Sequence, residues 1–310
     1  MTSKTINEFK KFLAKITKKS FFSVHEPDLK KSDYKLLKKC IEKNEVSASG
    51  SLEKKLEEKI KKLTKAKYVI FTNSGTSALH ISYILSGIKH NDEVIMPAFT
   101  FVASANAVKY CNGIPHFVDI EPKNFTIDTE KLSKYLQKIL IKRKNHFINK
   151  KTKNIVKAIM PVHPYGHPCD MRTIKKIALK YKLKIIEDAA DALGSYYYGR
   201  HVGTFGDFGV LSFNGNKIVT AGAGGAILTN NKFLAKKSKN LVCVAKNPHP
   251  YKMTYNDIGY NYRIPNINAA LLLSQLTRFK SIIGKKRKLF EKYKFFFKNK
   301  KNFKLVNEPQ

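Results

Sequence analysis

The chain has 310 residues, of which 43% are hydrophobic, 11% aromatic and 26% charged. These proportions are typical of a folded globular chain with one large or two ordinary domains, and they argue against intrinsic disorder as its main state. Lys and Arg number 59 against 23 Asp and Glu, so the formal net charge is +36. Such a charge fits an anionic partner such as nucleic acid, a membrane surface or a phosphorylated substrate, but lysines that decorate solvated faces are the favoured interpretation.

The kind of basic residue weakens the nucleic-acid hypothesis. Only six of the basic residues are Arg and 53 are Lys, spread along the whole chain, whereas base reading favours the bidentate guanidinium. No apolar run approaches the roughly 18 residues of a membrane span, and the N-terminus lacks a signal-peptide pattern, so we expect a cytoplasmic protein without a membrane partner. Four cysteines without close pairing are expected to be reduced packing residues: Cys40, Cys111, Cys169 and Cys243.

The first third of the chain changes from helices to an alternating pattern. Residues 27–66 have helical apolar spacing, interrupted by SASG at 47–50. Strands and helices then alternate, which favours a mainly parallel sheet covered on both faces. The expected strands are 67–72, 92–97 and 114–120, and the expected helices are 77–85 and 103–110.

The alternation continues to about residue 235, after which helices dominate. We expect a lysine-rich helix over 129–152 and a helix over 171–181, with strands at 156–163, 184–188, 209–213 and 225–230, and helices at 267–276 and 282–300. This divides the chain into an N-terminal helical segment (1–66), a large α/β domain (67–235), and a helical region with the start of a small C-terminal domain (236–310).

The segment NSGTSALH (73–80) follows an expected strand and opens a helix. The amides of Gly75, Thr76 and Ser77 would then point toward a phosphate at the helix N-terminus. Taken alone, however, this motif is weak, and a simple turn with a helix cap is the favoured explanation.

Two further residues could take part in chemistry at a site that binds such a phosphate. Asp188 ends a strand in IIEDAADALGS, at the sheet edge where open α/β folds bind ligands, and it could hold the protonated ring nitrogen of pyridoxal phosphate. Lys217, in SFNGNK, lies among small and apolar residues, a setting suited to imine chemistry. Each residue alone has an ordinary explanation, as a helix cap or a surface lysine. Together, in this order, they indicate a pyridoxal phosphate enzyme.

These motifs resemble the DegT/DnrJ/StrS family of pyridoxal phosphate-dependent sugar aminotransferases over essentially the whole chain. The resemblance rests on NSGTSALH, PAFTFVASANAV, PVHPYGHPCDM, IIEDAADALGS, GTFGDFGVLSFNGNK, AGAGGAILTN and GYNYRIPNINAA. It implies the fold of aspartate aminotransferase-like enzymes (PLP-dependent transferase fold type I). The narrower likeness is to enzymes that aminate position 4 of UDP- or GDP-linked 4-keto-6-deoxy-N-acetylhexosamines, the legionaminic acid and bacillosamine type.

The resemblance also implies roles for individual residues. Lys217 would form the internal aldimine and move the proton, and Asp188 would hold the pyridinium nitrogen. The other implied cofactor contacts are the phosphate ligands Gly75, Thr76, Ser77, Ser212 and the neighbouring subunit's copy of Asn261, the ring-stacking Phe101, and Asp191 near the ring hydroxyl.

Several other candidate site residues have both a functional and an ordinary structural interpretation. Phe101 by itself could be an ordinary core aromatic. His163 and Tyr165 could contact the substrate. No third ligand at metal spacing accompanies His163 and His167, so these two are expected to be pocket-wall or turn residues rather than a metal site. Arg263 could contact the phosphate across a dimer interface, or form a cap or salt bridge.

The implied enzyme is a homodimer with shared active sites, takes glutamate as its amino donor, and acts on a nucleotide sugar for surface polysaccharide, lipopolysaccharide or flagellin glycan. Family members continue for about 60 to 80 residues more, so we expect a truncated small domain. The alternatives are a catalytically impaired or regulatory relative and a nucleic-acid-binding protein, although no basic helix-turn-helix is recognisable. Dehydrases of this fold carry histidine in place of the imine lysine, so Lys217 argues against that branch.

Overall fold

The computed structural model describes residues 3–21, 25–48, 51–247, 249, 251–300 and 302–308. Its helices are α1 (Ser3–Thr17), α2 (Lys31–Glu42), α3 (Glu53–Thr64), α4 (Gly75–Leu85), α5 (Val102–Tyr110), α6 (Thr129–Ile139), α7 (Met171–Tyr181), α8 (Lys232–Val242), α9 (Asn266–Thr277) and α10 (Phe279–Phe297), with a 3-10 turn at Pro164–Gly166. Its strands are β1 (Tyr68–Thr72), β2 (Glu93–Pro97), β3 (Ile114–Val118), β4 (Leu140–Arg143), β5 (His146–Asn149), β6 (Val156–Ile159), β7 (Lys184–Asp188), β8 (Tyr196–Tyr197), β9 (Arg200–His201), β10 (Phe208–Ser212) and β11 (Gly225–Thr229).

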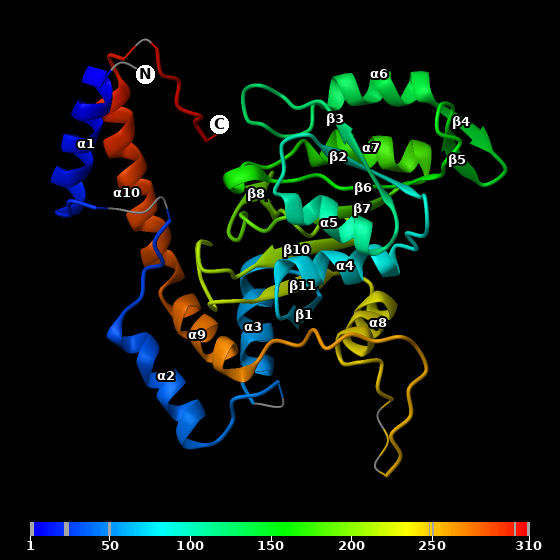
Figure 1. Cartoon of the computed structure of the whole chain (residues 1–310), viewed down its shortest axis with the longest axis horizontal. Helices are drawn as coiled ribbons and strands as arrows, with labels where there is room; N and C mark the ends of the chain where they lie inside the picture. The colour runs from blue at the N-terminus through cyan, green and yellow to red at the C-terminus, as the bar shows by residue number, and fades with distance from the viewer. Residues whose placement is uncertain are drawn as a thin grey trace.

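A seven-stranded sheet forms the centre of the molecule, with strand order β1-β11-β10-β7-β6-β2-β3 (Figure 1). Neighbouring strands from β10 to β3 run parallel, whereas β11 is antiparallel to both β1 and β10. The expected mainly parallel α/β sheet is therefore confirmed. Parallel strands place their carboxyl ends at one edge, where ligands of such folds bind.

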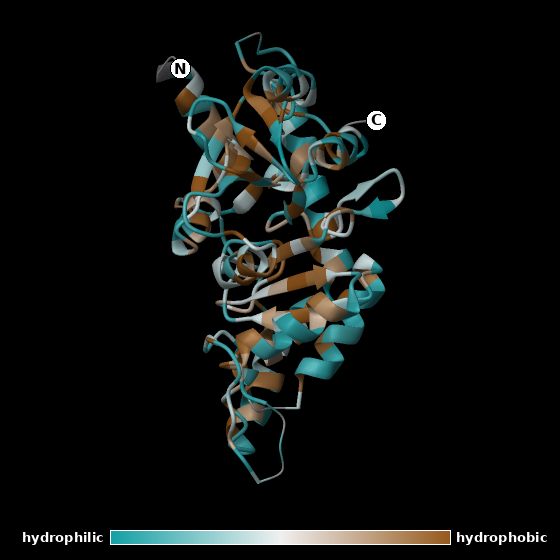
Figure 2. Cartoon of the chain, turned by 90° about the vertical axis from the view of Figure 1, so that its right-hand side faces the viewer, coloured by the Kyte–Doolittle hydropathy of each residue, from teal (hydrophilic) through white to brown (hydrophobic). Residues whose placement is uncertain are grey.

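Helices cover both faces of this sheet, as the buried side chains show. Along β1, Ile70 packs into a core with α4, α5 and α8, whereas Val69 and Phe71 pack on the other face with α3 and α9. Farther along the sheet, α6 and α7 cover that same second face around Ile95 and Ile159. Successive strand residues point to opposite faces, and both faces are largely apolar here, so brown segments recur along the central strands in Figure 2.

The prediction of one helix over 129–152 is wrong. Helix α6 ends at Ile139, and β4 and β5 form an antiparallel hairpin that pairs Leu140 with Asn149. Lys144 in the turn has a left-handed backbone (φ 52°). The hairpin lacks the Asn-Gly or Asp-Gly turn that usually marks such a connection, and its lysines resemble those of the preceding helix.

Helices α1 and α10 lie side by side at one end of the molecule (Figure 1). Phe12 of α1 stacks on Phe296 with ring centroids 4.5 Å apart, and Phe9 lies 5.5 Å from Phe297. Lys300 adds an ion pair to Glu8 at 2.6 Å. Aromatic contacts thus join the two ends of the described chain. Within the described ranges, no helix combines the length and the apolar content that crossing a bilayer requires.

Candidate functional site

A cavity of about 520 Å³ opens at the carboxyl ends of the parallel strands. Its walls come from the segments that follow β1, β2, β6, β7 and β10. Nine of the predicted site residues line it: Gly75, Thr76, Phe101, His163, Tyr165, Asp188, Asp191, Ser212 and Lys217. Residues separated by more than 140 positions in the sequence therefore meet at one site, as the motifs predicted.

The N-terminus of α4 forms one wall of the cavity. Ser74 caps the helix by accepting a hydrogen bond from the amide of Ser77 at 3.0 Å. Gly75 lies against Ser212, where an added Cβ would be 3.0 Å from the Ser212 Cβ. The first-turn amides of a helix lack intrahelical acceptors, so those of Gly75 and Thr76, with the Ser212 hydroxyl nearby, suit an anionic group.

Ser77 is placed differently from the other predicted phosphate ligands. Its side chain is buried, and its hydroxyl donates to Asn73 Oδ1 at 2.6 Å. It does not line the cavity. In this structure Ser77 therefore supports the helix cap.

Asp188 is held on the cavity floor by two donors. The Ser104 hydroxyl donates to Oδ2 at 2.7 Å, and the Ala190 amide donates to Oδ1 at 3.1 Å. Burial raises the pKa of Asp188, whereas the hydrogen bond from Ser104 and the positive charge of Lys217 act in the opposite direction. A buried carboxylate in this position is suited to bind a cationic ligand group.

Lys217 lies in the turn after β10 and forms an ion pair across the cavity. Its Nζ is 2.6 Å from Asp191 Oδ1, and its side chain is only 16% exposed. The turn is closed by a hydrogen bond from the Lys217 amide to the Asn214 carbonyl at 3.0 Å. The site thus contains an amine that is shielded from bulk water, with a carboxylate beside it.

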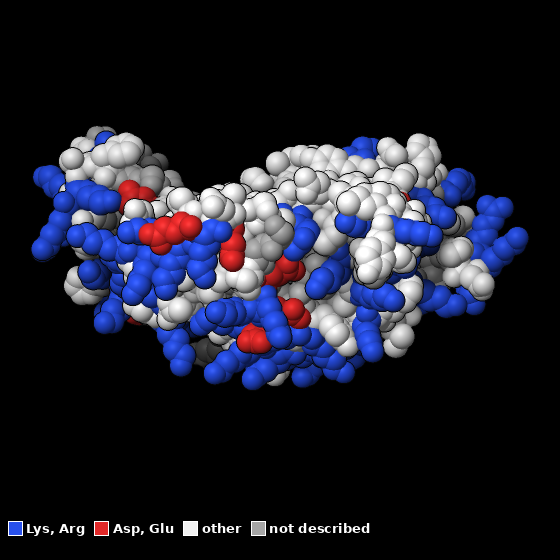
Figure 3. Space-filling model, turned by 90° about the horizontal axis from the view of Figure 1, so that it is seen from below, with Lys and Arg blue, Asp and Glu red and all other residues white. Residues whose placement is uncertain are grey.

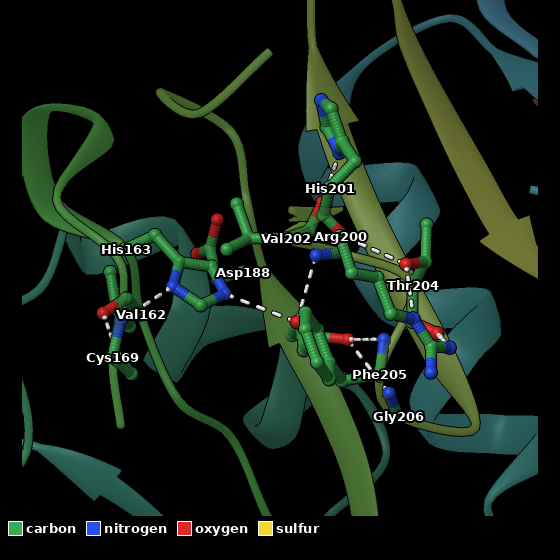
Figure 4. A network of polar contacts seen from close by, with 12 residues as sticks. Val162, His163, Cys169, Asp188, Arg200, His201, Val202, Thr204, Phe205 and Gly206 are labelled. Atoms are coloured by element: carbon green, nitrogen blue, oxygen red, sulfur yellow. Dashed lines mark hydrogen bonds and ion pairs between the residues drawn. The ribbon is translucent and has the colours of Figure 1, made fainter. Parts of the chain in front are cut away.

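His163 forms part of the wall and is fixed by bonds to both ring nitrogens (Figure 4). Nδ1 accepts from the Cys169 amide at 3.1 Å, so the neutral ring carries its proton on Nε2, 3.2 Å from Glu187 Oε2. Glu187 is fully buried and also accepts from the amides of Gly203, Phe205 and Gly206. His163 consequently presents its ring, rather than a free nitrogen, to the cavity.

Aromatic side chains surround the mouth of the cavity. Tyr165 and Phe101 are 69% and 75% exposed, respectively, so Phe101 is not a core aromatic. Phe99 packs between Tyr165 and Phe125, with ring centroids 6.1 and 5.2 Å away. Tyr165 has φ of 53°, a conformation that costs energy in a bulky residue.

Asn261 and Arg263 are not brought into this cavity. Both line a separate hollow of about 770 Å³ with Lys246 and His249. Arg263 forms a 3.1 Å ion pair with Glu53. Their predicted contact with the phosphate involves a second subunit and remains a prediction.

Several residues that line the cavity were not predicted from the sequence, among them His25, Thr100, Ser104, Asn214 and Asn216. Thr100 and Ser104 are four residues apart at the start of a helix, a spacing that places two hydroxyls on one side. This spacing was the available signal, because both residues lie within the PAFTFVASANAV motif.

Positive charge does not gather at one place on the face shown in Figure 3. Lys and Arg side chains are distributed along its whole length, with a few Asp and Glu among them. This distribution resembles solvated lysines more than a single basic groove for a nucleic-acid strand. In the part of the chain that the structure describes, no group of His, Cys, Asp and Glu could hold a metal ion.

A lysine amine, a buried carboxylate and a helix terminus around one cavity, on a mainly parallel sheet, define a pyridoxal phosphate-dependent transferase of the aminotransferase class. Residues 27–310 match the model of the DegT/DnrJ/EryC1/StrS aminotransferase family. The chain belongs to this family. The predictions of family, fold class, enzyme class and cofactor are thereby confirmed.

Individual relatives agree with this assignment. The chain is 36% identical to GDP-perosamine synthase of Escherichia coli O157:H7 over 275 residues, which are 88% of this chain and 71% of that protein. PseC of Helicobacter pylori, an aminotransferase of pseudaminic acid biosynthesis, superposes with a TM-score of 0.80 at 28% identity, covering 90% of this chain and 71% of PseC. NtdA of Bacillus subtilis, solved with its cofactor PMP bound, gives a TM-score of 0.69 at 32% identity, covering 80% of this chain and 52% of NtdA.

The residues around the cavity fit pyridoxal phosphate. Lys217 would supply an amine for its aldehyde, Asp188 a carboxylate for its ring nitrogen, and Gly75, Thr76 and Ser212 the donors for its phosphate. The volume of about 520 Å³ lies in the range of ligand pockets, roughly 300–1,000 Å³.

Proposed function

We propose that this chain is a nucleotide-sugar aminotransferase that converts a GDP- or UDP-linked 4-keto-6-deoxy sugar to its 4-amino sugar, with glutamate as amino donor. The observation that carries the proposal is the convergence of Lys217 and Asp188 on the cavity that the α4 N-terminus borders. The relationship to GDP-perosamine synthase supports a nucleotide-linked sugar as the substrate. The product would enter the synthesis of a bacterial surface glycan.

Bound pyridoxal phosphate supplies an electron sink that makes the substrate carbon next to the transferred nitrogen acidic. Asp188 keeps a proton on the ring nitrogen, because a buried anion 2.7 Å from the Ser104 hydroxyl stabilises a cation beside it. The α4 N-terminus and Ser212 anchor the phosphate and so fix the ring in the cavity.

Lys217 would act as the proton carrier. Its Nζ takes the proton from the substrate carbon and returns a proton on the other side of the reacting C–N unit. Asp191, 2.6 Å away, holds the ammonium form of Lys217 within the cavity between these transfers. The Lys217 side chain is only 16% exposed, which limits competing proton exchange with water.

The second subunit completes the site in this proposal. Asn261 and Arg263, which lie in their own hollow outside the cavity, would reach the phosphate of the neighbouring subunit in a homodimer. The exposed Tyr165 and the fixed ring of His163 would form a wall of the sugar pocket.

The test is to incubate the purified protein and pyridoxal phosphate with glutamate and a GDP- or UDP-linked 4-keto-6-deoxy sugar, and to identify the product by mass spectrometry and NMR. A 4-amino sugar, formed with stoichiometric 2-oxoglutarate and absent with Lys217→Ala, is the expected result. Turnover by Lys217→Ala at the wild-type rate, or no amino sugar from either nucleotide, would refute the proposal.

A further inference from the structure

A chain of two hydroxyl groups leads from the cavity wall to Asp188. Thr100 Oγ1 donates to Ser104 Oγ at 2.9 Å, and Ser104 Oγ donates to Asp188 Oδ2 at 2.7 Å. Ser104 is fully buried, in the first turns of α5, whereas Thr100 precedes the helix and lines the cavity. The direction of the chain is fixed, because each hydroxyl has one proton and the carboxylate can only accept.

The backbone of Asp188 is fixed independently of its side chain. Its amide donates to the Pro161 carbonyl at 2.9 Å, and its carbonyl accepts from the His163 amide at 3.0 Å. The remaining freedom is rotation of the carboxylate. Ser104 on Oδ2 and the Ala190 amide on Oδ1 remove that freedom, one oxygen each.

We propose that Ser104 is a positioning residue for Asp188, and that Thr100 supports it by orienting the Ser104 hydroxyl. The inference rests on the proposed role of Asp188 toward the cofactor ring. Ser104 contacts the carboxylate rather than the cofactor, so it acts by keeping one carboxylate geometry and by stabilising the anionic form at a buried position.

The charges around Asp188 explain why such a donor matters. Burial raises the pKa of Asp188, the nearby Asp191 adds to this effect, and Ser104 opposes it. Lys217 is the nearby cation, and it is paired with Asp191. Tyr83, whose phenol interacts with Asp188, stays neutral because burial raises its pKa well above the ordinary value. His163, whose ring is fixed by Cys169 and Glu187, completes the wall.

The test compares pyridoxal phosphate binding by wild type and Ser104→Ala across pH, measured as the dissociation constant from cofactor absorbance and protein fluorescence. We expect binding about tenfold weaker for Ser104→Ala, because a hydrogen bond to a charged group is lost. The acid limb of its affinity–pH curve should also move to higher pH, because Asp188 becomes easier to protonate. Equal affinities, or a uniform loss at every pH without movement of the limb, would overturn the proposal.

Ser82→Ala is the matched control, because Ser82 is as buried as Ser104 but donates within α4 to the Ala78 carbonyl at 2.7 Å. It should bind the cofactor within about twofold of wild type, since its hydroxyl bonds within α4 and not to the Asp188 carboxylate. A loss equal to that of Ser104→Ala would overturn the positioning role.

Thr100 provides a second route if Ser104→Ala does not fold. Thr100→Val removes the hydroxyl and keeps the shape, whereas Thr100→Ser keeps the hydroxyl. We expect weakening of about two- to threefold for Thr100→Val and wild-type affinity for Thr100→Ser, because loss of an outer hydrogen bond costs less than loss of the bond to the charge. Equal affinity of these two variants would overturn the role of Thr100, and with a misfolded Ser104→Ala it would overturn the whole proposal.

Asp188→Asn separates this proposal from the function on which it rests. We expect it to weaken binding by about 100-fold, more than Ser104→Ala does, because it removes the charge itself. Wild-type binding by Asp188→Asn would remove the proposed role of Asp188. Weak binding by Asp188→Asn together with normal binding by Ser104→Ala would leave that role intact and overturn only the inference about Ser104.

Discussion

The ion pair between Lys217 and Asp191 should restrain the amine, and Asp191→Asn tests this restraint without changing the size of the side chain. Lys217 Nζ lies 2.6 Å from Asp191 Oδ1, with side chains 16% and 38% exposed. Ion pairs with this partial exposure contribute about 0.2–1 kcal/mol. At about 1.4 kcal/mol per tenfold, Asp191→Asn should raise the population of unpaired Lys217 about 1.4- to 5-fold.

The assay is trace acetylation of the cofactor-free protein with acetic anhydride, followed by mass spectrometry of the peptide that contains Lys217. The Asp191 carboxylate restrains and covers the Lys217 Nζ, so acetic anhydride should label Lys217 more readily, by the same factor, once this partner is removed in Asp191→Asn. Lys184, paired with Asp207 at 2.9 Å, provides the internal reference, because it lies outside the cavity and should be labelled equally in both proteins. Unchanged labelling of Lys217, with Lys184 constant, would refute the restraint.

Two further predictions concern the buried network behind the cavity. Glu187→Gln should lower the free energy of unfolding by about 2–4 kcal/mol, because an amide NH2 would face donors that now bond the carboxylate. Urea unfolding measures this loss of stability, with Glu58→Gln, at an exposed position, as the control. Equal unfolding midpoints for Glu187→Gln and wild type would contradict the prediction. Burial lowers the pKa of His201 from 6.5 to about 4. Its contribution to stability is therefore complete above pH 6.5 and is lost as the pH falls toward 4, by about 3 kcal/mol at about 1.4 kcal/mol per pKa unit. His201→Gln should show a shallower loss over this window, and parallel curves would show that His201 is not responsible.

The alternation of strands and helices could be predicted because parallel strands are buried on both faces and give short apolar runs. The prediction failed at 140–149, where lysines continue the pattern of α6 and no glycine marks the turn at Lys144. Only the folded chain shows that a hairpin forms there.

The candidate site could be predicted in part for a similar reason. Asp188 ends β7, and Gly75 and Lys217 lie in the segments that follow β1 and β10, so strand topology brings them together. The bond from Ser104 to Asp188 joins residues 84 positions apart. Local sequence patterns carry no signal for such a tertiary contact, and the same holds for His25, which reaches the cavity from the segment before α2.

The central claim is that Lys217 is the cofactor lysine among the 53 lysines of the chain. Sodium borohydride makes the link between a lysine amine and the cofactor aldehyde permanent, and peptide mass spectrometry then locates it. The account predicts the label on Lys217, its loss when glutamate is added before the reductant, and no specific label in Lys217→Ala. A specific label on another lysine, or a label on Lys217 that glutamate leaves in place, would contradict it.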